Sequence, residues 1–82
     1  MRDLPVSGEI WRHFKGTPYV IFTIALNTET EEKMVVYGNE AGDTFCRPLG
    51  QFMSPVDRKK YPKATQIWRF EKMYFRRKKD GS

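Results

Sequence analysis

The chain has 82 residues, which suffices for one small domain and excludes a large enzyme scaffold. Hydrophobic residues make up 39% of it and aromatic residues 15%, which excludes a disordered chain. Residues 1–46 carry four basic and seven acidic groups, a net charge of −3, whereas residues 47–82 carry eleven basic and three acidic groups, a net charge of +8. We therefore expect the second half to meet an anionic partner.

The sequence has no feature typical of an exported or membrane protein. Its single cysteine, Cys46, excludes an intrachain disulfide, and with one histidine it cannot form a four-ligand zinc site within one chain. The first residues hold no apolar signal-peptide region, and the longest apolar stretch, residues 19–26, is too short to span a membrane. We expect a cytoplasmic protein with no membrane association, no metal and no cofactor.

Hydrophobic alternation and turn residues predict the first two strands at residues 6–14 and 19–26, with a Gly-Thr-Pro turn at 16–18 between them. In the second strand, side chains two residues apart share one face, and one of these faces is entirely apolar. We expect that face to lie in the core; it consists of Val20, Phe22, Ile24 and Leu26.

The third strand is predicted at residues 33–37, which are rich in β-forming residues. A glycine-containing turn leads to a fourth strand at 44–47, which Pro48 ends because proline lacks a backbone donor. The remaining elements are a helical turn at 49–53, a loop at 54–65 and a last strand at 66–73.

Short strands with short turns predict an all-β fold, either a small SH3-like barrel or a half-open roll of about five antiparallel strands with one short helical turn. We expect one domain over residues 1–73 and a basic, flexible tail over residues 74–82. The expected core consists of Val20, Phe22, Ile24, Val36, Leu49, Phe52 and Phe70.

Several motifs resemble, in the same order, a small family of bacterial and phage proteins known only as a domain of unknown function. They are a His-x-Lys-Gly turn at 13–16, a Glu-Thr hairpin tip at 29–30, Val-Val-Tyr at 35–37, Arg-Pro-Leu at 47–49 and Arg-Phe-Glu at 69–71. The resemblance covers residues 7–73 and implies a small β-barrel with no established activity.

This chain departs from the family's pattern at two positions. Similar sequences usually have an arginine after Val-Val-Tyr, where this chain has Gly38. Their next turn is longer and often has an aromatic residue where this chain has Ala41. If these positions line the family's site, the ligand of this protein differs from that of its relatives.

Basic and aromatic residues on the predicted strands and their closing turns are the candidate ligand-binding residues. Arginine and lysine bind phosphate oxygens, and aromatic rings stack on bases. The alternative for each residue is structural: Arg47 would fix the corner through backbone carbonyls, and Arg69 would pair with a nearby acid. The candidates are Trp11, Arg12, His13, Lys15, Tyr37, Phe45, Arg47 and Arg69.

Antiparallel hairpins bring strand ends together, so we expect Arg12, Lys15 and Arg47 to converge at one mouth of the barrel. The nearest acids in the sequence are Glu9 and Asp43. If these acids neutralise the cluster, the arginines are structural. If they point away, the cluster is a site for an anion.

Two basic runs lie beside aromatic residues, one at 58–60 before Tyr61 and one at 76–79 after Phe75. Basic residues interleaved with aromatic ones are typical of nucleic-acid binding. The alternative is a solvated loop and a solubilising tail.

Together these features predict a non-enzymatic protein that binds a phosphate-bearing ligand, either a small nucleotide, which it would sequester as a signal, or a short nucleic acid. The alternative is a protein-interaction module that uses an aromatic groove or an exposed strand edge, and open edges also favour a homo-oligomer. Catalysis is not expected, because the acids cluster in predicted hairpin tips and Cys46, on a strand, is expected to be a small core residue.

Overall fold

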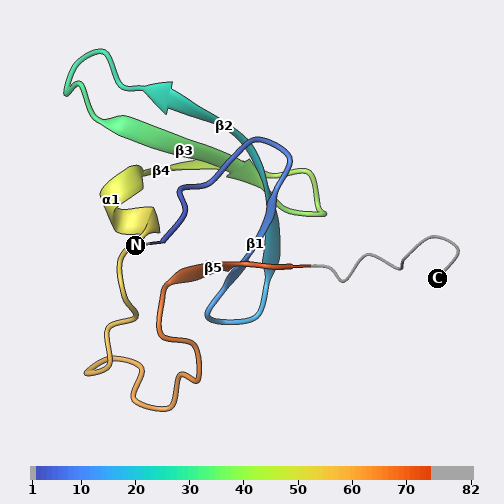
Figure 1. Ribbon diagram of the computed structural model, residues 1–82, viewed down its shortest axis with the longest axis vertical. Coiled ribbons are helices and arrows are strands. Elements are labelled where there is room, and N and C mark those ends of the chain that lie inside the picture. Colours follow the sequence, from blue (N-terminus) through green and yellow to red (C-terminus); the bar gives the residue numbers. More distant parts are fainter. Residues whose placement is uncertain (1, 75–82) are drawn as a thin grey trace, which may run out of the picture.

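The computed structural model describes residues 2–74, and its main element is one antiparallel sheet with the strand order β4-β3-β2-β1-β5 (Figure 1). This confirms the predicted all-β fold of five strands and a short helical turn. The sheet is not closed into a barrel, so the half-open roll is the form the chain adopts. The elements are β1 (Ile10–His13), β2 (Pro18–Leu26), β3 (Lys33–Gly38), β4 (Thr44–Pro48), α1 (Leu49–Phe52) and β5 (Phe70–Lys72).

Glycine sets the geometry of two of the turns that separate these strands. Gly16, in the β1–β2 turn, has a φ of 105°, and Gly42, in the β3–β4 turn, has a φ of 92°. Side chains with a Cβ rarely adopt these values, so glycine is favoured at both positions. The β1–β2 turn is closed further by a hydrogen bond of 2.9 Å from the His13 N–H to the Thr17 carbonyl.

The buried face of β2 is not the predicted one. Ile21 is 1% exposed, whereas Phe22, which we expected in the core, is 45% exposed. A β-bulge shifts the pairing with β3 between Ile21 and Thr23. The extra residue interrupts the alternation, so Ile21 and Ile24 both pack inward, although they are three residues apart. The prediction was wrong because it assumed an uninterrupted strand.

The same choice of face holds along β3, where Val35 is buried and Val36 is only half-buried. Of the other expected core residues, Val20 is half-buried and Leu26 is exposed, whereas Leu49 packs against the core. The predicted burial of two phenylalanines is confirmed. The buried core cluster consists of Trp11, Ile21, Val35, Tyr37, Phe52 and Phe70.

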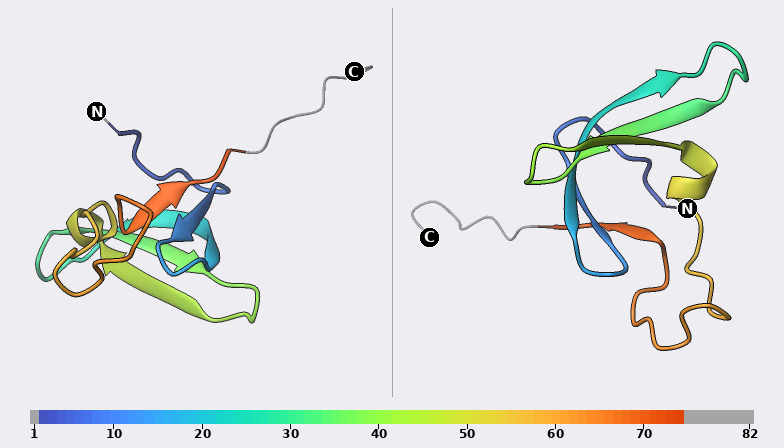
Figure 2. Two further views of the ribbon diagram at one scale, coloured as in Figure 1. Left: turned by 90° about the horizontal axis from the view of Figure 1, so that it is seen from below. Right: turned by 180° about the vertical axis from the view of Figure 1, so that it is seen from behind.

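The rings of Phe52 and Phe70 stack at the centre of this cluster, with centroids 4.1 Å apart and planes 9° apart. Phe52 belongs to α1, which directly follows the edge strand β4, and Phe70 begins the opposite edge strand β5. This contact therefore links the two edges of the sheet across its inner face, and the sheet curls around it (Figure 2).

The segment between α1 and β5 is held to the sheet by scattered polar contacts rather than by a strand. Of the strand predicted at 66–73, only Phe70–Lys72 forms. The buried side chain of Gln66 donates from Nε2 to the carbonyls of Arg12 and Trp68, at 2.9 Å in each case. These bonds fix the loop of residues 54–69 beside β1.

Among residues 2–74, no helix is both long enough and apolar enough to cross a membrane. The predicted basic tail, apart from Tyr74, lies outside the described residues, as does the basic run at 76–79.

We expect Phe52→Ala to lower the free energy of unfolding by about 3–5 kcal/mol, because it removes a fully buried ring and leaves a cavity. Phe22→Ala removes the same atoms from a half-exposed position, and we expect a loss of about 1 kcal/mol. Urea unfolding of both variants measures the difference. An equal loss in the two variants would contradict the assignment of the inner face.

Candidate functional site

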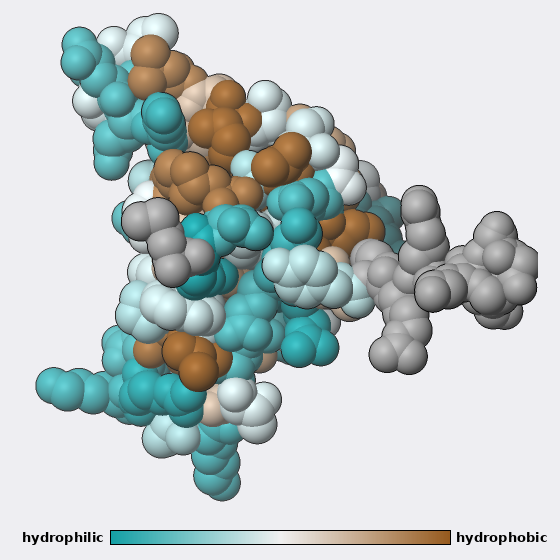
Figure 3. Space-filling model, in the orientation of Figure 1, coloured by the Kyte–Doolittle hydropathy of each residue, from teal (hydrophilic) through white to brown (hydrophobic). Residues whose placement is uncertain are grey.

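A pocket of about 300 Å³ lies where the β1–β2 turn meets the loop of residues 54–69. Figures 1 and 2 show this turn and this loop at the same end of the molecule. In Figure 3 that end is mostly hydrophilic, whereas hydrophobic side chains gather on the upper half of the same face. We call this the cationic pocket; its lining residues are His13, Phe14, Lys15, Arg47, Asp57, Lys60, Tyr61 and Arg69.

The curl of the sheet assembles this pocket from distant parts of the chain. Arg47 lies on one edge strand, and Arg69 directly precedes the other. The Phe14 N–H donates to the Arg69 carbonyl at 2.9 Å, which joins the β1–β2 turn to that second edge. The guanidinium carbon of Arg47 lies 5.9 Å from the ring centre of Phe70, so it reaches the same place from β4.

Positive charge dominates the pocket. Four of its lining side chains are basic, and one, Asp57, is acidic. Asp57 is itself engaged by its own loop, since its Oδ1 accepts hydrogen bonds from the backbone N–H groups of Lys59 and Lys60. Within residues 2–74, the one ion pair closer than 4.0 Å joins Lys72 and Glu9 at 2.8 Å, outside the pocket. The pocket therefore holds an excess of cations that no carboxylate pairs with directly.

His13 is the neutral member of this group. Its Nδ1 accepts a hydrogen bond of 3.1 Å from the Lys15 backbone N–H, which leaves the single proton of the neutral ring on Nε2. Burial, together with the positive charges of Arg47, Lys15 and Arg69, lowers the pKa of His13 to about 4. At neutral pH the ring adds no charge and offers a hydrogen-bond donor.

The two arginines of the pocket differ in how they are satisfied. Arg47 donates from Nε to the hydroxyl of the buried Tyr37 at 3.2 Å. The Nε of Arg69 is buried and has no hydrogen-bond partner among the described residues. A buried donor without an acceptor costs about 1–3 kcal/mol, so this side chain would gain from an acceptor that reaches it.

Aromatic side chains form one wall of the pocket and carry two of its cations. Phe14 and Tyr61 meet edge to face with centroids 4.8 Å apart. The ammonium groups of Lys15 and Lys60 lie 5.1 Å and 5.6 Å from the ring centre of Tyr61. Both distances are within the range of cation–π attraction, which holds the ammonium groups at the mouth.

Several predicted candidates come together here. The lining includes His13, Lys15, Arg47 and Arg69. Tyr37 does not line the pocket, but its hydroxyl accepts the hydrogen bond from Arg47. Phe45 packs against Tyr37 with centroids 5.6 Å apart and is partly exposed on β4.

Trp11 and Arg12 lie elsewhere. Trp11 is buried in the core and donates from Nε1 to Glu9 at 3.0 Å. Arg12 is exposed and donates to the Gln66 side chain at 3.3 Å, so it does not converge with Lys15 and Arg47 as expected. Alternation explains this, because Arg12 points away from the face that holds its neighbours Trp11 and His13.

The two acids that the sequence places nearest to the cationic residues form contacts outside the pocket. Glu9 pairs with Lys72, and Asp43 accepts a hydrogen bond of 3.3 Å from the Asn39 side chain. Neither residue lines the cationic pocket.

Sequence reasoning missed the remaining lining residues. The basic run at 58–60 beside Tyr61 was a signal, but it was interpreted as a solvated loop or a nucleic-acid footprint. Of this run, only Lys60 lines the pocket; Arg58 donates to the Ala64 carbonyl at 2.6 Å. The missed residues are Phe14, Asp57, Lys60 and Tyr61.

Cys46 is exposed, which corrects the expectation that it is a core residue. It follows Phe45 and precedes Arg47 on an edge strand, and alternation turns it to the outer face, away from His13. Within residues 2–74, no three His, Cys, Asp or Glu side chains are grouped so as to hold a metal ion.

These features define a small, open β-sheet domain with a cationic pocket between its two edges. The chain belongs to the DUF1653 family of proteins of unknown function, whose model matches residues 9–72. All residues that line the pocket fall within that range. No curated protein and no solved structure matches the chain.

Gly38, one of the two positions at which we expected this chain to depart from the family's pattern, lies outside the pocket. It is buried next to Tyr37, and a Cβ atom added there would lie 2.7 Å from the ring of Phe22. Because Tyr37 faces inward, a side chain at position 38 would point to the outer face of the sheet. This departure therefore leaves the cationic pocket unchanged.

We expect the single histidine resonance in an NMR titration to report a pKa of about 4 for His13. Arg47→Ala removes a repulsive charge and should raise this pKa toward 6.5, whereas Arg12→Ala, on the other face, should not change it. The folded-state pKa lies below the unfolded value, so the unfolded chain binds more protons between about pH 6.5 and pH 4. His13 therefore lowers stability as the pH falls through that window. A wild-type pKa near 6.5 would contradict the electrostatic account of the pocket.

Proposed function

We propose that this protein is a non-enzymatic binding module that holds a phosphate-bearing ligand in the cationic pocket. The observation that carries the proposal is that four basic side chains from β4, the β1–β2 turn and the loop of residues 54–69 line one pocket with a single carboxylate. Like charges held together repel one another, and water screens this repulsion less at the half-buried Arg47 and Arg69. An anion would offset that repulsion.

The chemistry of the lining suits a phosphate group better than a carboxylate. Arginine forks and lysine ammonium groups bind phosphate oxygens through charge-assisted hydrogen bonds. A phosphate monoester carries a charge of about −1.5 to −2 at neutral pH and offers three strong acceptor oxygens. Arg47, Arg69 and Lys60 supply donors for several oxygens at once, and the unsatisfied Nε of Arg69 adds one more.

The size and walls of the pocket favour a small nucleotide over a polymer. A volume of about 300 Å³ is at the lower end of small-molecule sites. Phe14 and Tyr61 provide an aromatic wall for the part of the ligand beyond its phosphate. Sequestration of a nucleotide signal is one use of such a site.

We expect Arg47→Ala to weaken binding of adenosine monophosphate about 10- to 150-fold, because each charge-assisted hydrogen bond contributes about 1.5–3 kcal/mol. Lys60→Ala should weaken it about tenfold, for the same reason. Its matched control is Lys59→Ala, which removes the same charge from the next residue, outside the pocket. Isothermal calorimetry against adenosine monophosphate, inorganic phosphate and a short single-stranded DNA measures all three variants.

The controls distinguish a pocket from general charge attraction. Equal weakening by Lys59→Ala and Lys60→Ala would show that affinity follows net charge, and the proposal would fail. If the protein binds the single-stranded DNA, and this binding is lost in Arg77→Ala and falls steeply with salt, then the basic tail binds a polymer and the pocket is not the site. Mass spectrometry of small molecules released from the denatured, purified protein identifies the natural ligand.

A protein-interaction module is the second candidate, and the sheet topology favours it. β4 and β5 are both edge strands, so each has one side without a partner strand within the sheet. Pairing of such an edge with a second copy would give a homo-oligomer. Light scattering over a range of protein concentrations tests this, and a constant monomer mass would exclude self-association through the edges.

A further inference from the structure

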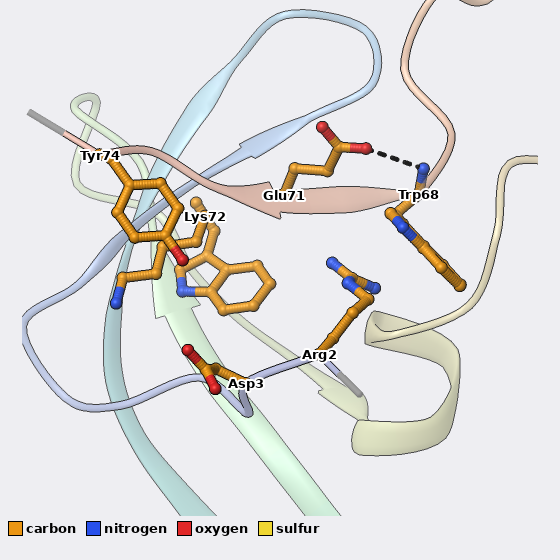
Figure 4. Close-up of a pocket in the computed structure, with 7 residues that line it drawn as sticks. Arg2, Asp3, Trp68, Glu71, Lys72 and Tyr74 are labelled. Carbon is orange, nitrogen blue, oxygen red and sulfur yellow. Dashed lines mark hydrogen bonds between the residues drawn. The ribbon is translucent and has the colours of Figure 1, made fainter.

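A second cleft, of about 430 Å³, lies between the N-terminal segment and β5 (Figure 4). We call it the N-terminal cleft, and it shares no lining residue with the cationic pocket. Three of its lining side chains are aromatic and two are acidic. The residues are Arg2, Asp3, Trp11, Trp68, Glu71, Lys72 and Tyr74.

Arg2 forms part of the wall of this cleft, where it contacts aromatic rings and backbone carbonyls of distant residues. Its guanidinium carbon lies 4.3 Å from the ring centre of Trp68 and 5.6 Å from that of Trp11. One terminal nitrogen donates to the Met53 carbonyl at 3.1 Å, and the other donates to the Phe70 carbonyl. The side chain therefore has an aromatic face against it and an acceptor for each arm of its fork.

One acidic group acts on Arg2 without touching it. Figure 4 shows Glu71 on β5, with its carboxylate turned away from Arg2 and bonded to the Trp68 backbone N–H at 3.1 Å. Burial lowers the pKa of the Arg2 guanidinium, and the negative charge of Glu71 opposes this. The guanidinium is thus partly removed from water and lies against an aromatic ring, and the charge of Glu71 acts on it without a direct ion pair.

The groups that bind Arg2 lie within the range that the family model matches, whereas Arg2 does not. Met53, Trp68 and Phe70 lie within the range that the family model matches, and Arg2 lies before its start at residue 9. In the segment that carries Arg2, Leu4 and Val6 are exposed, whereas Pro5 between them is buried. Arg2 is thus bound by residues that are distant from it in the sequence.

We infer that the groups that hold Arg2 beside the N-terminal cleft, the Trp68 ring and the Met53 and Phe70 carbonyls, form a binding site for the side chain of an arginine in a polypeptide. Arg2 fills this site from within the chain, and a partner's arginine fills it when Arg2 is displaced. The geometry selects arginine over lysine. A flat guanidinium stacks on an indole and donates to two acceptors at once, whereas an ammonium group presents a point charge without that fork.

Chemical rescue tests this inference. Arg2→Ala empties this site. We expect N-acetyl-arginine amide to bind the variant about tenfold more tightly than N-acetyl-lysine amide binds it. N-acetyl-arginine amide should also bind the variant about tenfold more tightly than it binds the wild-type protein. Trp11 and Trp68 are the two tryptophans of the chain and both lie at the cleft, so tryptophan fluorescence reports occupancy. Arg58→Ala is the matched control, because it also removes an arginine bonded to a backbone carbonyl, but away from the cleft. It should bind arginine amide no better than the wild-type protein.

Equal affinity of Arg2→Ala for the two amides, or equal affinity of Arg2→Ala and wild type for arginine amide, would overturn the inference. A further variant, Arg2→Ala with Trp68→Leu, should lose the rescue because the stacking surface is gone. If Arg2→Ala does not fold alone, arginine amide should restore the native fluorescence during refolding and lysine amide should not; restoration by neither would also overturn the inference. Nucleotide binding in the cationic pocket is measured separately and does not affect this result.

Discussion

The stacked pair of Phe52 and Phe70 is the contact on which the architecture depends. No strand pairing joins β4 to β5, so hydrogen bonding does not close the sheet. The aromatic contact brings the two edges together instead, and the rings of Trp11 and Tyr37 pack on Phe52 at 5.5 Å in each case. In so small a domain, whose total stability is on the order of 5–15 kcal/mol, one such cluster decides whether the fold persists.

The cationic pocket follows from this curl. Arg47 and Arg69 belong to opposite edges of the sheet, and they line one pocket because the core draws those edges together. The same core supplies local support, since Tyr37 accepts the Arg47 hydrogen bond and the ring of Phe70 lies near its guanidinium. Arg47 and Arg69 are half-buried, so their mutual repulsion is weakly screened by water and lowers the stability of the fold. The proposed anion would offset that repulsion.

The N-terminal cleft has the opposite character, with aromatic and acidic groups around a single guanidinium. Lys72 is a further lining residue, but it is paired with Glu9. The domain thus has two clefts of opposite lining, one with an excess of cations and one with aromatic and acidic groups beside a guanidinium.

The sequence predicted the number and order of the strands, because turn residues such as Gly16 and Pro48 mark strand ends directly. The first strand, predicted at 6–14, and the last, predicted at 66–73, are shorter than expected. It did not predict the inner face of β2, since nothing in the local pattern reveals the bulge that turns Ile21 inward and leaves Phe22 outside. The pocket was predicted in part. Strand-end residues were found by alternation and position, whereas Lys60 and Tyr61 come from a loop held in place by the distant contact of Gln66 with β1.

The His13 pKa in the presence of ligand tests the central claim most directly. Burial and the positive charges of Lys15, Arg47 and Arg69 together lower the pKa of His13 to about 4. Saturating adenosine monophosphate or inorganic phosphate should raise this pKa, since an anion in the pocket offsets those charges. A pKa that stays at about 4 with saturating amounts of both ligands would show that no phosphate enters the cationic pocket, and it would contradict the account.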